Sequence, residues 1–484
     1  MPVEKQYSKI LSTTRLRESE VSGRTIVTES ESDRGRVLFS PAFRRLQQKA
    51  QVFSMEPNAA VRSRLTHSLE VSQLGRFIGD EICARLKGRL EPDQMVSYVN
   101  FIETACLFHD IGNPPFGHFG EAAIQKWFRD NGNDCILKAT SHPNVEEVEH
   151  YLADFYEFDG NPQGFRVVTR LQWNSDEYGL NLTKTTLASF LKYIRCAGEK
   201  ENGLFTSKAG YFSTESSIVE SIREEFGFTA PQRFPLAYVM EAADDIAYCI
   251  SDLEDSVEKG LVEKSSAIKE IEKYFTSNNL PDTDPIKQKI TEALEAVKNG
   301  QRADGKRFTY TDFRTTLNRT LVTYVANKYV ELEAEIFSGT LDSLLPRSES
   351  PGAILEALKQ YCRNHVYCHA TVQLTELAGY TAIRGLLDLY KPLLTMPRAS
   401  FAKALDNHKR DALGTSIVIE SKLLSLYPKN YIKVYKHHLS SIADRDDSDY
   451  LEWNARAHLI VDFVSGMTDD FAMTTYQSLS GMRL

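Results

Sequence analysis

Two short stretches of this chain contain the residue types from which a metal-centred hydrolytic site is built. The first is Arg64-Leu-Thr-His67-Ser, and the second is Phe108-His109-Asp110-Ile-Gly-Asn-Pro-Pro-Phe-Gly-His-Phe-Gly-Glu121. The adjacent His109 and Asp110 offer an imidazole nitrogen and a carboxylate oxygen, and the distant His67 can complete one side of a divalent ion. The sequence therefore predicts a metal site whose fourth ligand lies further along the chain.

The fourth ligand is expected on a helix over residues 235–255, which carries Pro235 in its first turn, where the missing N–H is harmless. One face of this helix is apolar, and a polar stripe at i, i+4, i+7 and i+11 runs beside it: Asp244, Tyr248, Ser251 and Asp255. Buried carboxylates are costly unless something binds them. With Asp244 the donor set has two nitrogens and two oxygens, which suits Mn²⁺, Mg²⁺, Co²⁺ or Fe²⁺ better than a structural four-coordinate zinc.

Two further helices must position the other ligands. Apolar residues recur at three- and four-residue steps over residues 65–86, which predicts an amphipathic helix that begins near His67. A second helix is expected from about Asp93 to the His109-Asp110 pair, where Gly112 ends it and two prolines enforce a turn. The pair is thus placed at a helix C-terminal end, facing a tight loop.

His118 and Glu121 form a candidate acid-base pair next to the metal ligands. They are three residues apart and share a face if a helix begins at about Gly117. A carboxylate beside an imidazole orients the ring and raises its pKa, as a general acid near a phosphate ester requires. The alternative is an ordinary surface pair, and the proximity of the His-Asp pair favours function.

The rest of the chain also reads as helical, without a Pro/Gly/Ser-rich linker. We expect a single continuous helical body over residues 1–484, with an N-terminal basic segment (1–60), a catalytic core (61–260) and a helical C-terminal region that completes the substrate pocket (261–484). Irregular segments are expected at a few places: a loop or small hairpin at 197–215, surface excursions at 277–287 and 299–307, and breaks at Pro346 and Pro351.

Composition places the chain among soluble globular proteins, because 42 % of its 484 residues are hydrophobic and 25 % are charged. Its seven cysteines are odd in number and mostly lie in apolar runs, which favours reduced thiols and a cytoplasmic location. The N-terminus lacks the apolar core of a signal peptide, and no run of about 18 apolar residues occurs, so export and membrane spanning are not expected.

The charge is uneven along the chain. The net charge is −9, yet residues 1–65 contain twelve Lys and Arg against seven Asp and Glu. This local basic excess suits a polyanionic partner, and it keeps single-stranded DNA open as a binding partner or effector. The alternative is that the arginines of this segment simply solvate helix faces: Arg34, Arg36, Arg44 and Arg45.

The ligand pattern resembles that of the HD-domain phosphohydrolases, and longer strings resemble one branch of them, the bacterial deoxyguanosine triphosphate triphosphohydrolases. The strings are Glu31-Ser-Asp-Arg-Gly-Arg, Ser40-Pro-Ala, Arg44-Arg-Leu-Gln-Gln-Lys, Arg62-Ser-Arg-Leu-Thr-His67-Ser, the His109 to Glu121 stretch, Gly160-Asn-Pro-Gln-Gly, Met240-Glu-Ala-Ala-Asp-Asp-Ile and Ser465-Gly-Met-Thr-Asp. The resemblance implies an all-α fold, an HD-domain helical bundle with additional C-terminal helices and at most a small β-hairpin.

The activity implied by this resemblance is metal-dependent hydrolysis of dGTP, or of other dNTPs, to a deoxynucleoside and tripolyphosphate. Metal-bound water would attack the α-phosphorus, with Mn²⁺ or Mg²⁺ as cofactor. His118, held by Glu121, would handle a proton at the leaving 5′ oxygen or prepare the attacking water. Members of the family are commonly homo-oligomers, often hexamers.

Substrate contacts also follow from the resemblance. Gln51 and Val52 are expected against the deoxyribose, and Arg64 against phosphate. Tyr248 would leave no room for a 2′ hydroxyl, while Asp252 would accept from the 3′ hydroxyl. Three residues are candidates to complete the substrate pocket at or near the base: Asn161, Glu376 and Arg410.

The chain departs from the family at two places, around 158–162 and in an insertion after Lys409, so guanine specificity follows less directly than the chemistry. Two alternative functions remain at this point. One is another HD phosphohydrolase, a nucleotidase or a phosphodiesterase of signalling nucleotides. The other is a regulator that binds nucleotides or single-stranded DNA.

Overall fold

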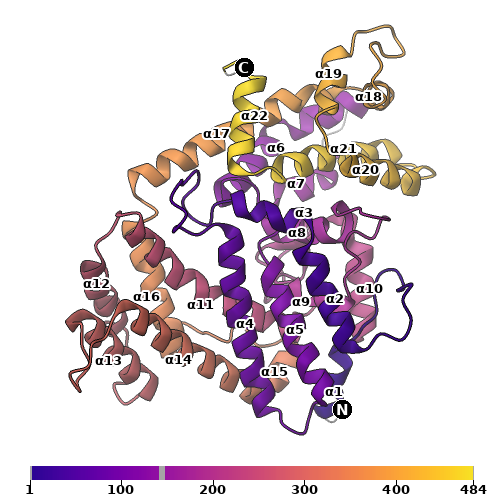
Figure 1. Cartoon of the computed structure of the whole chain (residues 1–484). Coiled ribbons are helices and arrows are strands. Elements are labelled where there is room, and N and C mark those ends of the chain that lie inside the picture. Colours follow the sequence, from indigo (N-terminus) through magenta and orange to yellow (C-terminus); the bar gives the residue numbers. More distant parts are fainter. Residues whose placement is uncertain (1–2, 141–147, 483–484) are drawn as a thin grey trace.

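The computed structural model describes residues 3–140 and 148–482, and in these residues the chain is almost entirely helical (Figure 1). The all-α prediction is confirmed. Three helices form the N-terminal segment: α1 (Val3–Ile10), α2 (Ile26–Leu38) and α3 (Pro41–Arg45).

The catalytic region contains the elements predicted to carry the metal ligands. They are α4 (Arg64–Arg85), α5 (Pro92–Phe108), α6 (Gly117–Thr140), α7 (Ala153–Tyr156), α8 (Gly160–Arg166), α9 (Lys184–Phe190), β1 (Arg195–Cys196), β2 (Ala209–Tyr211), α10 (Ser216–Phe226) and α11 (Pro235–Glu258). Ser63 caps α4 through a reciprocal capping box with Thr66. Glu91 caps α5, two residues before the expected start near Asp93, and Pro92 occupies its first turn.

A loop or a small hairpin was expected at 197–215; the structure has a loop there, and the two short strands that it joins pair in parallel rather than as a hairpin. The connection between β1 and β2 folds around one side chain. The Arg195 guanidinium donates to the carbonyl oxygens of Glu199 and Thr206, each at 2.7 Å. The loop between the strands thus closes around this buried arginine.

The C-terminal region consists of two groups of helices. The first gathers α12 (Lys264–Thr276), α13 (Pro285–Asn299), α14 (Tyr310–Glu331), α15 (Glu333–Ser338) and α16 (Ser350–His365). The second contains α17 (Ala370–Thr395), α18 (Arg398–Leu405), α19 (Val418–Leu424), α20 (Lys429–Ile442), α21 (Ser448–Ser465) and α22 (Asp469–Leu479). A break was expected at Pro351, but this residue lies in the first turn of α16, where proline is favourable.

The catalytic helices lie at the centre of the molecule. Figure 1 places α4, α5 and α11 between α12, α13, α14 and α16 on one side and α2, α9 and α10 on the other, while α6 lies with α17–α22 above them. One connected apolar core runs from α1 to α22. That the chain forms a single body with the three subregions named above stays a prediction.

Two smaller expectations concern the cysteines and the membrane. All seven cysteines are free thiols, and all but Cys368 are buried. Among the described helices, none has the length and apolar content needed to cross a membrane.

Candidate active site

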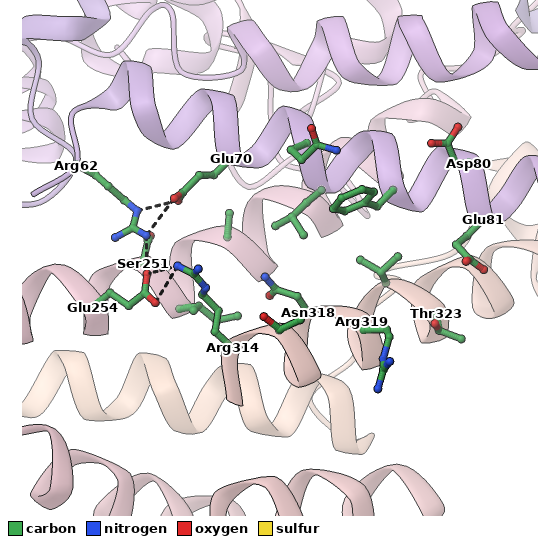
Figure 2. A pocket seen from close by; sticks show the side chains of 17 residues that line it. Arg62, Glu70, Asp80, Glu81, Ser251, Glu254, Arg314, Asn318, Arg319 and Thr323 are labelled. Carbon is green, nitrogen blue, oxygen red and sulfur yellow. Dashed lines mark hydrogen bonds and ion pairs between the residues drawn. The ribbon is translucent and has the colours of Figure 1, made fainter. Parts of the chain in front are cut away.

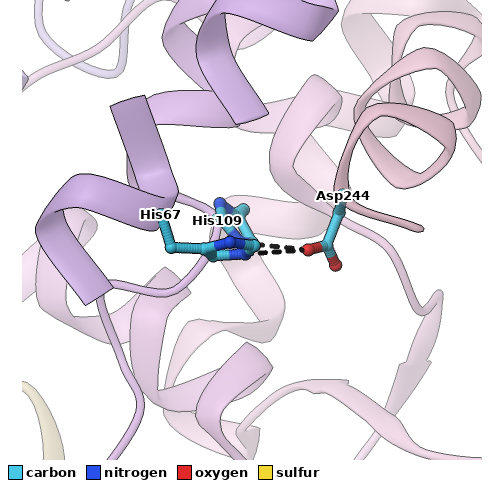
Figure 3. A group of neighbouring side chains, drawn as sticks. All are labelled: His67, His109 and Asp244. Atoms are coloured by element: carbon cyan, nitrogen blue, oxygen red, sulfur yellow. Dashed lines mark hydrogen bonds and ion pairs between the residues drawn. The ribbon is translucent and has the colours of Figure 1, made fainter. Parts of the chain in front are cut away.

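Three of the four predicted metal ligands meet at one point (Figure 3). Asp244 Oδ1 lies 3.3 Å from His67 Nε2 and 3.4 Å from His109 Nε2. The donor atoms of the three side chains all lie within 4.8 Å of one another. Two imidazole nitrogens and a carboxylate oxygen converging at this spacing form a set that can hold a divalent ion.

Each ligand is positioned by the end or the interior of a helix. His67 is fully buried in the first turn of α4. His109 caps the C-terminus of α5, and its Nδ1 lies 2.7 Å from the carbonyl oxygen of Cys106. Because that hydrogen bond takes up Nδ1, Nε2 is the nitrogen free to bind a metal.

The turn after His109 is held by close packing against α8. A side chain at Gly112 would overlap the backbone of Gly160 and Gly164, and a side chain at Gly160 would overlap Asn113. Two of the strings noted in the sequence, the His109 stretch and Gly160-Asn-Pro-Gln-Gly, therefore pack directly on each other. Glycine is required at these contacts, since even a methyl group would push the turn away.

Asp110 is the one predicted ligand outside this cluster of three. It lies beside the cluster, and its carboxylate contacts two other side chains. Arg64 donates to Oδ2 at 2.6 Å and Asn113 donates to Oδ1 at 2.6 Å, while His109 Nε2 lies 3.7 Å from Oδ2. Each carboxylate oxygen has a second lone pair, so Asp110 can bind a metal while Arg64 and Asn113 orient it.

The electrostatics of the cluster favour a cation. His109 Nε2 is buried and has no hydrogen-bond partner among the described residues. Burial alone would lower the pKa of His109, but Asp110 and Asp244 outweigh it and raise the pKa to about 9. Burial would raise the pKa of Asp110, yet Arg64 and His109 bring it down to about 2. The buried carboxylates thus stay ionised and attract positive charge, which a divalent ion would supply; the residues present fit such an ion.

His118 and Glu121 interact as the sequence predicted. Both lie in the first two turns of α6, and His118 Nδ1 is 2.7 Å from Glu121 Oε2. The other Glu121 oxygen accepts the Gly160 N–H at 2.8 Å, which fixes the carboxylate. The imidazole itself points into an open cavity, where 85 % of the side chain is exposed. The hydrogen bond to Glu121 raises the pKa of His118 above its ordinary value.

Replacing Glu121 with glutamine is expected to lower the pKa of His118, because the amide removes the charge that favours the imidazolium. The corresponding limb of the pH profile of kcat should move to lower pH. A shift of the alkaline limb identifies His118 as a proton donor, and a shift of the acidic limb identifies it as a proton acceptor. A pH profile identical to that of Asp134→Asn, an exposed carboxylate on the same helix, would contradict the coupling.

A cavity of about 620 Å³ adjoins the metal cluster and His118. Most of the predicted substrate residues line it: Gln51, Val52, Arg64, Asn161, Tyr248 and Glu376. The side-chain oxygen of Gln51 is buried and lacks a hydrogen-bond partner in the described part of the chain, so an acceptor is available there. These side chains therefore line the same cavity as His109, Asp110 and Asp244.

Two predicted substrate residues do not line this cavity. Asp252 is 1 % exposed and accepts a hydrogen bond from Tyr367, which is the side chain that faces the cavity at this point. Burial raises the pKa of Asp252 to about 7. Arg410 lies in an exposed loop, where it donates to the carbonyl oxygen of Gly414 at 2.6 Å. These positions place Asp252 behind the cavity wall and Arg410 away from it.

Several cationic and aromatic residues of the cavity were missed in the sequence. They are Lys192, Tyr193, Lys208, Lys359, Arg363 and Tyr367. Lys192 and Lys208 lie in irregular segments next to the short strands, where no periodicity marks them. Lys359 and Arg363 carried a usable signal, since an i, i+4 pair of cations on α16 faces one direction.

The Ser465-Gly-Met-Thr-Asp469 segment holds two loops of the active site. The buried Asp469 carboxylate accepts the N–H groups of Ala50 and Phe116, each at 3.1 Å. The buried Lys49 ammonium donates to the carbonyl oxygens of Asn113 and Ser465, at 2.5 and 2.8 Å. The loop that leads to Gln51 and the loop that leads to His118 are thus tied to the start of α22.

This tie restrains a strained backbone. Phe116 adopts a left-handed conformation with φ of 62°, which is unfavourable for a residue with a side chain. Its ring packs where Gly379 of α17 leaves room, because a side chain at Gly379 would overlap the ring. The C-terminal helices therefore keep the turn before His118 in the conformation that aims this residue into the cavity.

Asp469→Asn is expected to lower kcat about 10- to 100-fold with a smaller change in KM, because a displacement of about 1 Å at the catalytic group is enough for such a loss. The amide cannot accept both backbone N–H groups as a carboxylate does. Steady-state kinetics should be compared with Asp470→Asn, the exposed neighbouring carboxylate. Equal kcat in the two variants would contradict the positioning role.

Four arginines of the N-terminal basic segment make contacts within the protein. Arg34 pairs with Glu103 at 3.0 Å, and Arg36 donates to the carbonyl oxygen of Leu180 at 2.8 Å. Arg44 donates to the Phe39 carbonyl and Arg45 to the Tyr431 hydroxyl. The reading of these arginines as structural side chains is the one that their contacts favour.

Comparisons with known proteins agree with this geometry. A model of the HD domain matches residues 64–158, which include three of the four predicted metal ligands and the His118–Glu121 pair. The chain is 36 % identical to the probable deoxyguanosinetriphosphate triphosphohydrolase of Pseudomonas aeruginosa, over 94 % of each chain. It is 37 % and 36 % identical to the deoxyguanosinetriphosphate triphosphohydrolases of an Enterobacter species and Cronobacter sakazakii, over 93 % of each chain. This chain therefore belongs to the HD-domain deoxyguanosinetriphosphate triphosphohydrolase family.

Proposed function

We propose that this protein hydrolyses dGTP to deoxyguanosine and tripolyphosphate with the help of a divalent metal ion. The observation that carries the proposal is one cavity that joins the His67–His109–Asp244 cluster, the exposed His118 and several cationic side chains. Such a cavity accommodates a polyanion with its reacting phosphorus near both a metal and a proton-transfer group.

The ion would be held by His67, His109 and Asp244, with Asp110 as the fourth ligand, and Mn²⁺ or Mg²⁺ is expected. When bound, it would supply Lewis-acid polarisation of a phosphate oxygen and a water of lowered pKa. Arg64 keeps Asp110 ionised and oriented as a metal ligand, and the same arginine would contact a phosphate group of the substrate. His118 holds or receives the proton at the 5′ oxygen or at the attacking water, and Glu121 sets its pKa.

The triphosphate would bind the cationic side of the cavity. Three lysines of the cavity are already paired with carboxylates. Lys192 lies 3.6 Å from Glu241 and Lys208 lies 2.6 Å from Asp159. Lys359 lies 2.8 Å from Asp245. Burial without such partners would be unfavourable. Phosphate oxygens can take additional donors from the same ammonium groups, which have three N–H bonds each.

The sugar would lie against Tyr248. The Tyr248 hydroxyl is hydrogen-bonded to that of Tyr367 at 2.8 Å, and Tyr367 in turn donates to Asp252. This chain fixes the ring of Tyr248, so a ribose 2′ hydroxyl would meet a side chain that has little freedom to yield. Asp252, 1 % exposed, would act on the sugar through Tyr367 rather than by direct contact.

The base would be read at Glu376, on α17, at the edge of the cavity. Guanine presents two N–H donors on its Watson–Crick edge, and a carboxylate can accept both. Burial raises the pKa of Glu376, so the side chain gains from a donor that stabilises its ionised form. Asn161 contributes a further amide to the same cavity.

The test is a turnover assay of the purified protein with Mn²⁺ across the four dNTPs and four rNTPs. The proposal expects deoxyguanosine and tripolyphosphate from dGTP, with at least about a hundred-fold lower kcat/KM for GTP. Release of orthophosphate or pyrophosphate from dGTP would instead favour another HD phosphohydrolase activity and refute the proposed bond.

Homo-oligomer formation, with a hexamer favoured, is also proposed on the family resemblance. A cytoplasmic location is proposed from the free cysteines, and single-stranded DNA as an effector is proposed from the basic excess of the N-terminal segment. A basic groove of about 510 Å³ on α20 is the best-suited surface for DNA, because Trp173 lies there beside Lys429, Lys433, Lys436 and His437. Binding of an oligonucleotide should weaken steeply with salt. Its absence at low salt would remove DNA as a partner.

A further inference from the structure

A second groove, of about 600 Å³, lies between α4, α11 and α14 and is not part of the active site (Figure 2). One stripe of each helix lines it. On α11 the lining residues are Ala247, Ile250, Ser251 and Glu254: Ser251 belongs to the same polar stripe as Asp244 and Tyr248, and the other three lie to one side of that stripe. We call this space the α4–α11–α14 groove.

Ion pairs and a hydrogen bond join the helices near both ends of the groove. At one end the Arg62 guanidinium contacts Glu70 at 2.7 Å and Glu254 at 2.5 Å, and Arg314 contacts the same Glu254 at 3.1 Å. Near the other end of α4, Arg85 donates to Asn327 of α14 at 2.6 Å. These contacts lie at the two ends of the groove and leave its middle open to solvent, where Phe77 is 50 % exposed.

The middle of the groove is apolar, with two amides beside it. Its apolar side chains are Leu74, Phe77, Ala247, Ile250 and Val322. The Phe77 ring is 50 % exposed, so one face is free to stack. Gln73 and Asn318 supply the amides, and the Asn318 oxygen is buried without a hydrogen-bond partner among the described residues. A ligand with an aromatic face and an edge that donates a hydrogen bond would satisfy both features.

The charges of the groove argue against a polyanion. Four carboxylates line it against three arginines, and two of those arginines are already engaged in the ion pairs described above. We propose that the α4–α11–α14 groove binds a neutral heteroaromatic molecule of nucleoside size. Its ring stacks on Phe77, and its polar edge donates to Asn318.

Occupancy of the groove would reach the active site through the helices that form it. The same α4 and α11 carry His67 and Asp244, which must stay 3.3 Å apart. The Arg62 N–H also donates to Asp255 at 3.1 Å, and Arg62 stands two residues before the phosphate-facing Arg64. A ligand bound between α4 and α11 therefore lowers the turnover of dGTP, by about five-fold when the groove is saturated. This regulatory part rests on the proposed function, whereas binding to the groove does not.

Titration calorimetry with adenosine tests the binding step on the full chain, without metal or substrate. Adenosine carries an exocyclic amine as donor, and its ribose disfavours the active site. We expect saturable 1:1 binding that Asn318→Leu and Phe77→Ala each weaken at least about tenfold, and that Tyr248→Ala leaves unchanged. Adenosine monophosphate should bind more weakly than adenosine, because it adds negative charge to a groove with excess carboxylates.

Val322→Trp is a second variant that fills the groove, and it should abolish adenosine binding while raising or preserving the melting temperature. The proposal is overturned if adenosine does not bind, if Tyr248→Ala rather than Asn318→Leu removes binding, or if the groove variants change the oligomeric state, which would make this surface a subunit contact. Because binding is measured without turnover, a failure here is distinguishable from failure of the proposed function. If adenosine binds but leaves dGTP turnover unchanged, the regulatory part fails.

Discussion

Replacing His109 with alanine is expected to abolish both metal binding and turnover of dGTP, with a loss in kcat of at least about a thousand-fold. His109 Nε2 is buried without a hydrogen-bond partner in the described residues, and its removal leaves two of the three donors that converge at the cluster. The two buried carboxylates nearby then lose the cation that balances them. Asp110→Ala should have the same effect, since it also frees Arg64.

Bound Mn²⁺ is measured by elemental analysis after gel filtration, and turnover by release of tripolyphosphate. His408→Ala is the matched control, because His408 lies in an exposed loop far from the cluster in sequence and outside the cavity. A His109→Ala protein that retains stoichiometric metal and wild-type kcat would refute the ligand assignment. Circular dichroism establishes that the variant is folded.

The second large effect is expected at His118, whose replacement by alanine should lower kcat about 10²- to 10⁴-fold while leaving metal binding intact. The imidazole points into the cavity and is held by Glu121 at 2.7 Å, but none of its atoms belongs to the metal cluster. Loss of the proton-transfer group affects the chemical step, and the cations that bind the triphosphate stay in place.

Single-turnover kinetics separates the two steps, since the dependence of the rate on enzyme concentration reports binding and the limiting rate at saturation reports chemistry. His118→Ala should bind dGTP with a dissociation constant close to that of the wild type. If the variant instead loses its metal, His118 is a ligand, and if its kcat is unchanged, the residue takes no part in the reaction. Either result would require a different proton-transfer group.

The sequence predicted the elements of the metal site well because strong patterns coincide there. The apolar periodicity of 65–86 and 235–255 places His67 and Asp244 on α4 and α11, and glycine and two prolines end α5 at His109. Local rules of helix geometry are sufficient for such residues. The pairing of His118 with Glu121 follows from the same i, i+3 rule.

Contacts between segments that are distant in the sequence could not be predicted from these local rules. Asp252 shares a helical face with Tyr248, yet Tyr367 covers it, and nothing in the local sequence of α11 indicates a tyrosine from the loop after α16. Lys192 and Lys208 reach the cavity from irregular segments that are shaped by the buried Arg195.

The role of the C-terminal region was predicted in outline only. The expectation that residues 261–484 complete the pocket agrees with the positions of Lys359, Tyr367 and Glu376 along the cavity. The tie from Asp469 to the loops at Ala50 and Phe116 depends on tertiary contacts across more than 350 residues. Only the short Ser465-Gly-Met-Thr-Asp string marked this segment in advance.

The central claim is hydrolysis at the α-phosphorus of dGTP, and one isotope experiment tests it most directly. The protein is incubated with dGTP and Mn²⁺ in water enriched in ¹⁸O. The products are then separated, and their masses are measured by mass spectrometry. The account predicts ¹⁸O in the tripolyphosphate and unlabelled deoxyguanosine, because water attacks phosphorus and the 5′ oxygen leaves with the nucleoside. Label in the 5′ hydroxyl of deoxyguanosine, or products other than deoxyguanosine and tripolyphosphate, would contradict it.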